Sequence, residues 1–397
     1  MDFLAQRCPV TLPRRSNLTA FIIVLFCWQS LSALAEDTVV FHRDGKTEHL
    51  SGKLIVTAQD GGVMLQTPDG KLWNISPEEI VDHQQDDKPF TPLTAEQIKK
   101  QILRELPAGF DTVKTAHYLI FYNTSRGYAL WCSALFERLY TSFISFWTHR
   151  GFKLHEPETS LVILIYSDQS TYARQSTDEL QGVANRVIGF YSLQTNRVKT
   201  YDLTGAQSVR QPGDNKRMDA AQINDLLSLP AATTMVATVI HEATHQIAFN
   251  CGLQQRFADI PLWLCEGLAM YFETPDLGYG KGWRTIGEVN PARLQRFQNY
   301  LLRRPVDSLQ TLLADDKRFR SSDAQTALDA YAEAWSFNYF LLRMHSKEYE
   351  TYLQRLAEKD PLVWDGPAAR RKEFKACFGP DLAALDAEFV RYMARVK

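Results

Sequence analysis

Two histidines spaced one helical turn apart in an apolar stretch constrain the fold of this chain more than any other feature. From about Thr234 to Asn250 the sequence is typical of a helix, and Gly252 is well placed to end it. His241 and His245 are four residues apart there, so their rings lie on one helical face. The neighbouring residues are mostly apolar, which indicates a helix buried on most sides. Buried imidazoles are unfavourable unless they have partners.

A carboxylate that can complete a metal site follows on a second apolar segment. Glu266 lies within residues 261–272, which we expect to form a helix. Two imidazoles and one carboxylate leave the fourth position of a tetrahedral zinc ion open, which is the arrangement of catalytic zinc sites. We therefore predict a Zn²⁺ site with His241, His245 and Glu266 as its ligands.

The glutamate between the histidines has a different expected role. Glu242 follows His241 directly, so it is too close in sequence to be an equivalent ligand, yet it is placed to take a proton from a zinc-activated water. The pattern His-Glu-x-x-His also arises by chance in proteins without zinc. The apolar surroundings and the downstream carboxylate favour a zinc site. We predict a metallohydrolase, most simply a peptidase, with Glu242 as general base and acid.

The N-terminus has the pattern of a secretory signal. Arg14 and Arg15 precede an apolar run over residues 18–28, and small residues follow up to Ala35. We predict that residues 1–35 are a signal peptide, cleaved near Ala35, and that the protein is secreted or lies in the periplasm or cell envelope. A retained anchor is the alternative. The apolar run is shorter than the roughly 20 residues that span a bilayer, so we expect no membrane span after signal removal.

Charge and cysteine content limit the partners and cross-links that we expect. The whole chain has a formal net charge of −2, and this lack of a basic excess argues against a nucleic-acid partner. Four cysteines follow the signal, which permits two disulfides in any of three pairings, while free buried cysteines remain the alternative. These cysteines are Cys132, Cys251, Cys265 and Cys377.

The region that follows the signal is rich in short β-type runs. Asp44-Gly45, Asp60-Gly61 and Asp69-Gly70 separate these runs and are strong hairpin signals. We predict a small β-barrel-like or β-sheet module over residues 36–87. A linker at 88–108 follows, with a helix from about residue 94 to 106.

The remaining chain, residues 109–397, has strands first and helices afterwards. This order indicates an α+β domain with a helical C-terminal part. We expect strands at residues 117–122, 161–166, 187–191 and 197–203, and a long helix at 128–147. Beyond the histidine motif we expect further helices at 292–302, 326–344, 349–357 and 381–394.

The motif and its surroundings resemble two related groups of proteins. Residues 241–245 and 261–273 are similar to the gluzincin clan of zinc metallopeptidases, which includes thermolysin and the membrane alanyl aminopeptidases. More narrowly, residues from about 110 to 397 resemble a family of secreted, planctomycete-type proteins known as DUF1570. The phrases that carry this second resemblance are Tyr118–Ser125, Ala129–Tyr140 and Tyr331–Phe337.

The resemblance implies a fold and a set of site residues, but no established substrate. Residues 109–397 would form a gluzincin-like, thermolysin-type α+β metallopeptidase domain. His241, His245 and Glu266 would be the zinc ligands, and Glu242 the base or acid.

A further donor is needed for the negative charge that develops on a carbonyl oxygen during hydrolysis. Tyr331 lies about as far beyond the glutamate ligand as the tyrosine or histidine that serves this purpose in the clan, so we select it as a catalytic residue. The alternative is that Tyr331 and Trp335 are core aromatics at helical spacing. His345 is the reserve candidate, although a solvated histidine is the usual state in such polar sequence.

The resemblance also suggests how a substrate is held. Clan enzymes bind the peptide backbone along a sheet edge, and residues 187–191 are the segment that we expect there. Gly189 would let a substrate approach closely, or it marks a bulge without function. Glu273 and Asp276 are candidate partners of the ligand histidines, with helix-terminal surface acids as the alternative.

Two functions follow from these expectations. The first is a secreted zinc-dependent peptidase that acts on a peptide or protein substrate, with Glu242 transferring the proton to the leaving amine. The second is a catalytically inactive, zinc-containing binding or scaffold protein of the cell envelope, whose β module docks a wall component or partner. The sequence leaves the oligomeric state open.

Overall fold

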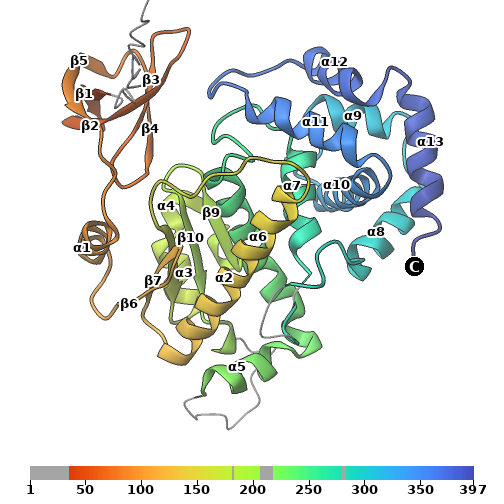
Figure 1. Ribbon diagram of the computed structural model, residues 1–397, viewed down its shortest axis with the longest axis horizontal. Coiled ribbons are helices and arrows are strands. Elements are labelled where there is room, and N and C mark those ends of the chain that lie inside the picture. The colour runs from red at the N-terminus through yellow and green to blue at the C-terminus, as the bar shows by residue number, and fades with distance from the viewer. Residues whose placement is uncertain (1–34, 181–182, 206–217, 275, 279–282) are drawn as a thin grey trace, which may run out of the picture.

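The described chain contains two open sheets and a helical C-terminal region (Figure 1). The computed structural model describes residues 35–180, 183–205, 218–274, 276–278 and 283–397. The predicted signal peptide lies outside the described residues, apart from Ala35. The prediction of an α+β chain is confirmed.

The N-terminal sheet has five antiparallel strands in the order β4-β3-β2-β1-β5. Asp44 and Gly45 have φ values of 52° and 73°, as a two-residue hairpin turn requires. Of the two predicted forms the sheet is observed and the barrel is wrong, because β4 and β5 are the two edges of an open sheet. Strands β3 and β4 have only four residues each, too few to curl the sheet round to β5. The strands are β1 (Ala35–Arg43), β2 (Lys46–Thr57), β3 (Val63–Gln66), β4 (Leu72–Ile75) and β5 (Ile80–Pro89).

A capped helix connects the two sheets. Helix α1 (Ala95–Glu105) begins after Thr94, whose side chain accepts from the Gln97 backbone while the Gln97 side chain accepts from the Thr94 backbone. The helix lies where the linker helix is predicted.

The second sheet has three parallel strands at its centre and an antiparallel strand at each edge, in the order β6-β7-β8-β10-β9. Every residue of β7, β8 and β10 is buried, which matches the continuous apolar runs of β7 and β8. In β10 the buried Arg197 and Lys199 form ion pairs with Glu105 and Glu179. Strand β9 is therefore an edge, as predicted for residues 187–191. The strands are β6 (Asp111–Lys114), β7 (Tyr118–Tyr122), β8 (Leu161–Tyr166), β9 (Gly189–Ser192) and β10 (Arg197–Tyr201).

Helices pack against this sheet and link it to the C-terminal region. Helices α2 (Arg126–Thr148) and α6 (Thr233–Asn250) contact each other and the sheet, and α6 also packs on α7 (Leu262–Phe272). In Figure 1, α6 and α7 lie between the second sheet and the C-terminal helices. The shorter helices of this part are α3 (Gln169–Gln175), α4 (Thr177–Leu180) and α5 (Ala220–Leu227).

The C-terminal helices surround α10 (Ala324–Met344), which packs on α7, α8, α11 and α13. Four of them lie close to their predicted positions: α8 (Pro291–Leu301), α10, α11 (Ser346–Ala357) and α13 (Leu382–Met393). Two others, α9 (Ser308–Ala314) and α12 (Pro367–Phe378), are not anticipated by the sequence analysis.

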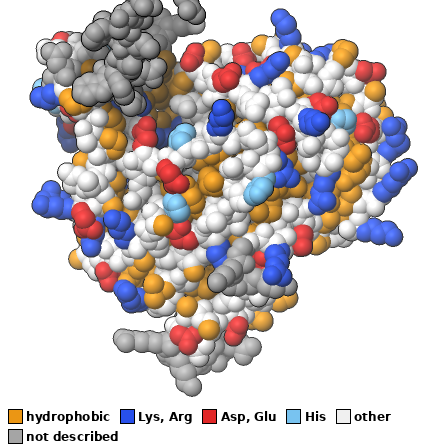
Figure 2. All heavy atoms as spheres, in the orientation of Figure 1, with side chains coloured by type: hydrophobic (Ala, Val, Ile, Leu, Met, Phe, Trp, Pro, Cys, Tyr) orange, Lys and Arg blue, Asp and Glu red, His pale blue; other side chains and the backbone are white. Residues whose placement is uncertain are grey.

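Charged side chains of both signs are interspersed over the face in Figure 2, with apolar surface between them. Within the described ranges, no single helix is long and apolar enough to cross a membrane. The segments Ala220–Leu227 and Pro230–Asn250 meet at a bend of 84°. They reach the length and apolar composition of a membrane span only when they are taken together.

The four cysteines that the structure describes are all free. Cys132, Cys251 and Cys265 are buried. Of the two possibilities left open by the sequence, free buried thiols are therefore the one observed for these residues.

Candidate metal centre

Helix α6 carries both histidines and ends where the sequence predicts. Its C-cap is Cys251, and Gly252 follows with φ +83°, the left-handed conformation that favours glycine. A Cβ at Gly252 would also lie 2.9 Å from the His155 ring. Both the turn and this close packing therefore require glycine.

The three predicted ligands come together with the spacing of a metal site. The Nε2 atoms of His241 and His245 are 3.1 Å apart, and Glu266 places its carboxylate oxygens 3.2 Å from the first and 3.6 Å from the second. A tetrahedral zinc ion with bonds of about 2.0–2.1 Å separates its ligands by roughly 3.3–3.4 Å. The residues therefore fit the ion by both donor chemistry and spacing.

Helix α7 positions Glu266 by packing tightly on α10. A Cβ at Gly267 would lie only 1.8 Å from the Asn338 side-chain nitrogen, so the two helices approach closely at this glycine. Asn338 donates from Nδ2 to the carbonyl oxygens of Trp263 and Ala334, both at 2.8 Å. These buried contacts fix the turn of α7 that carries the carboxylate.

Glu273 orients the first histidine. Its Oε2 lies 3.3 Å from His241 Nδ1, and its Oε1 accepts from Arg293 Nε at 3.2 Å and from Asn290 Nδ2 at 2.9 Å. A proton on Nδ1 leaves Nε2 as the lone-pair donor to an ion. Glu273 is only 5% exposed, so the surface-acid alternative is wrong for this residue. Asp276 is buried too, but it accepts from the Arg284 backbone and has no bond to either histidine.

Cys265 orients the second histidine, and the sequence analysis considers it only as a disulfide candidate. Its Sγ lies 3.5 Å from His245 Nδ1 and donates to Gln254 Oε1 at 3.6 Å. The sequence offered one signal for this role, the position of Cys265 directly before the carboxylate ligand. No sequence signal indicates Gln254, because it reaches Cys265 only through the turn after α6.

Glu242 faces the outer edge of β9. Its Oε2 accepts from the Tyr191 N–H at 2.8 Å, and burial raises the pKa of the carboxyl. Tyr191 pairs with β10 on its other side, so the outward groups of this edge strand point toward the site. A Cβ at Gly189 would lie 3.0 Å from the Lys199 carbonyl oxygen. Close packing inside the sheet therefore explains that glycine without a substrate.

The charges of the centre favour a cation. Burial lowers the pKa of His241, but hydrogen bonds to Glu266 and Glu273 outweigh this effect and raise it to about 10. The imidazoles hold the pKa of Glu266 well below its usual range, against the opposing effect of burial. A buried group of carboxylates needs a positive partner, which a metal ion supplies.

Tyr331 lies within the electrostatic field of the site. Burial and the charges of Glu266 and Glu242 raise the pKa of its hydroxyl. The ring packs edge-on against Phe319, with centroids 5.2 Å apart, and within the described part of the chain its hydroxyl has no hydrogen bond. The ring thus packs against the core, while the hydroxyl has no partner there, and its catalytic role stays a prediction. Trp335, one turn further on, is fully buried and is a core aromatic.

His345 does not belong to the site. Its Nε2 lies 3.2 Å from Glu388 Oε2, at the junction of α10 and α11. It is fourteen residues beyond Tyr331, which corresponds to about 21 Å along a helix. The reserve assignment is therefore wrong.

Comparison with known proteins finds one similarity, and it covers the part of the chain that holds this centre. Residues 235–363 match the model of a family described as a protein of unknown function (DUF1570). The matched range contains both histidines, Glu242, Glu266 and Tyr331. No curated protein matches the chain.

Proposed function

We propose that the chain is a zinc-dependent peptidase of the gluzincin, thermolysin-like type. The observation that carries this proposal is the convergence of His241, His245 and Glu266, whose ligand atoms all lie within 4.8 Å of one another. Glu242 lies beside this cluster, against a free sheet edge. The predicted signal peptide supports a secreted or cell-envelope location.

The ion would polarise a carbonyl oxygen and lower the pKa of a water molecule. Glu242 takes the proton of that water and transfers it to the leaving amine, held in place by the Tyr191 N–H. The Tyr331 hydroxyl donates to the oxygen that becomes negative. The outward backbone of β9 holds the peptide in an extended conformation.

The proposal is tested with Glu242→Gln on a broad peptide library. The change preserves side-chain shape and all three ligands but removes the proton acceptor, so we expect turnover to fall by at least about 100-fold. The bound metal, measured in the same preparations, should be unchanged. Glu288→Gln is the matched control, since Glu288 is an exposed acid away from the cluster.

Wild-type turnover in the Glu242→Gln protein would remove Glu242 as the base. Zinc without any turnover in the wild-type protein would contradict the peptidase and favour the inactive binding or scaffold protein.

A further inference from the structure

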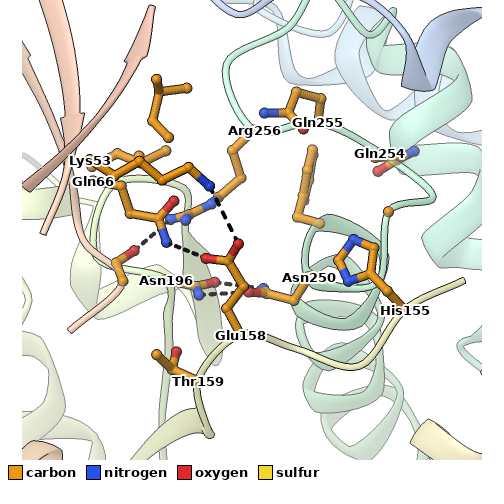
Figure 3. Close-up of a pocket in the computed structure, with 15 residues that line it drawn as sticks. Lys53, Gln66, His155, Glu158, Thr159, Asn196, Asn250, Gln254, Gln255 and Arg256 are labelled. Atoms are coloured by element: carbon orange, nitrogen blue, oxygen red, sulfur yellow. Dashed lines mark hydrogen bonds and ion pairs between the residues drawn. The ribbon is translucent and has the colours of Figure 1, made fainter. Parts of the chain in front are cut away.

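A cavity of about 180 Å³ lies between the N-terminal sheet and the metal-binding domain. Figure 3 shows side chains from both parts that converge on it, including Lys53 and Gln66 from one side and Asn250 and Arg256 from the other. Its volume is below the roughly 300 Å³ at which pockets for whole small-molecule ligands begin. It therefore suits one side chain or a chain terminus.

The cavity begins one helical turn beyond the second histidine ligand. Phe249 lines it, and its ring stacks on Tyr191 at 5.9 Å and lies 6.4 Å from the His245 ring. Asn250, the last residue of α6, and Gly252, just beyond it, also line the cavity, five and seven residues from His245. At the rise of a helix these separations correspond to about 8–10 Å, or about two to three residues of an extended peptide.

Several polar groups of the cavity already have partners. Glu158 lies 3.5 Å from Lys53 Nζ and accepts from Gln66 Nε2 at 2.9 Å. Asn196 and Asn250 bond each other through their side-chain amides at 2.8 Å. The dashed lines in Figure 3 follow these contacts.

Arg256 is the cation of the cavity that has no carboxylate partner. It is only 8% exposed, and its Nη1 donates to the carbonyl oxygens of Gly70 and Leu193 at 3.1 and 3.2 Å. Among the described residues it forms no ion pair. Burial lowers its pKa and outweighs the opposing charge of Glu158, which lines the same cavity, whereas carboxylates in direct contact outweigh burial and raise the pKa of Arg304 and Arg370.

Gln254 supplies a second buried donor. It is 3% exposed, and its Oε1 accepts from Cys265 while its Nε2 has no partner in the described structure. An unpaired buried donor costs about 1–3 kcal/mol, and more when it is charged. The unpaired Gln254 Nε2 and the Arg256 guanidinium, which forms no ion pair among the described residues, both line this cavity, and together they indicate a ligand that accepts hydrogen bonds and carries negative charge.

We propose that this cavity binds a carboxylate of the substrate, with Arg256 and Gln254 as its donors. The proposal rests on the proposed peptidase function and adds a specificity. A peptide that crosses the metal centre in extended form presents an acidic side chain, or its own C-terminal carboxylate, to the cavity about two to three residues from the cleaved bond.

Binding, measured without turnover, tests this proposal. The full zinc-loaded chain carrying Glu242→Gln is titrated with blocked peptides that differ only by glutamate or glutamine, placed at each position in turn. A second pair differs only by a free or an amidated C-terminus. These two arms distinguish an acidic side chain from a chain terminus. A charge-assisted hydrogen bond predicts at least about 10-fold tighter binding of one carboxylate peptide than of its neutral match.

Arg256→Gln should remove that preference, and Arg256→Lys should retain part of it. Lys317→Gln, which removes an exposed positive charge elsewhere, should leave it intact. Because each protein is compared on matched peptides, a general loss of stability does not imitate the result. Equal binding of every matched pair, or a preference that persists in Arg256→Gln, would overturn the proposal. If the wild-type protein hydrolyses peptides but shows no preference for a carboxylate, the proposed peptidase function is retained and only the proposed carboxylate site is rejected.

Discussion

At the scale of single residues, the proposed role of the Tyr331 hydroxyl as a donor to the oxyanion requires that it has no other hydrogen-bond partner. It is half-buried near two site carboxylates and has no hydrogen bond within the described residues. A hydroxyl that meets only the developing oxyanion contributes to the transition state and hardly to substrate binding.

Tyr331→Phe should therefore lower kcat by about 10- to 1000-fold and change KM much less. Steady-state kinetics on any cleaved peptide measures both constants. Tyr339→Phe is the matched control, because Tyr339 lies on the same helix but packs on Trp335 and Tyr271. Equal kcat values for Tyr331→Phe and wild type would exclude the hydroxyl from the reaction.

The convergence of the three candidate ligands could be predicted from sequence, but their orienting partners could not. The spacing of His241 and His245 places both rings on one face in any helix. Cys265 approaches His245, and Gln254 approaches Cys265, only because the turn after α6 brings the chain back. The prediction for His345 failed for a related reason, since the length of α10 carries it away from the centre.

At the scale of secondary structure elements, the contact between α7 and α10 determines where the third ligand lies. Gly267 follows that ligand directly, and its missing side chain admits Asn338. Alanine in a helix interior is usually favoured over glycine by up to about 1 kcal/mol. Overpacking costs about 1–3 kcal/mol, so the steric effect should exceed the gain in helix propensity.

Gly267→Ala should thus destabilise the protein by about 1–3 kcal/mol and weaken zinc binding through displacement of Glu266. Denaturant unfolding and a competitive zinc titration measure the two effects. Gly205→Ala is the control, because a Cβ there would have no atom within 4 Å. An unchanged unfolding midpoint with unchanged zinc affinity would contradict this account of the helix contact.

The regular elements could largely be predicted, because hairpin signals and apolar periodicity are local. The Asp44-Gly45 turn is one example, and the buried run of β8 is another. Closure of a sheet is a property of all its strands together, so the barrel prediction failed. Helix α12 was missed because only Arg370 and Phe374 of its twelve residues are buried, which leaves no clear apolar period.

At the scale of the whole chain, the N-terminal sheet docks beside the edge strand β9. The Leu72 N–H donates to the Gln194 carbonyl at 2.8 Å, in the turn between β9 and β10. Arg256 bridges the same turn and Gly70. The sequence could not predict this arrangement, because backbone contacts such as that of Leu72 have no residue signature. The small sheet thereby becomes one wall of the cavity beside the metal centre.

The most direct test of the central claim is the metal content of the protein purified without added metal. We predict about one zinc per chain by elemental analysis, because three candidate ligands place their donor atoms within 4.8 Å of one another. Glu266→Ala should lose most of it, and Glu288→Gln should keep it. Less than about a tenth of an equivalent in the wild type, unaffected by Glu266→Ala and not restored by added zinc, would contradict the zinc site.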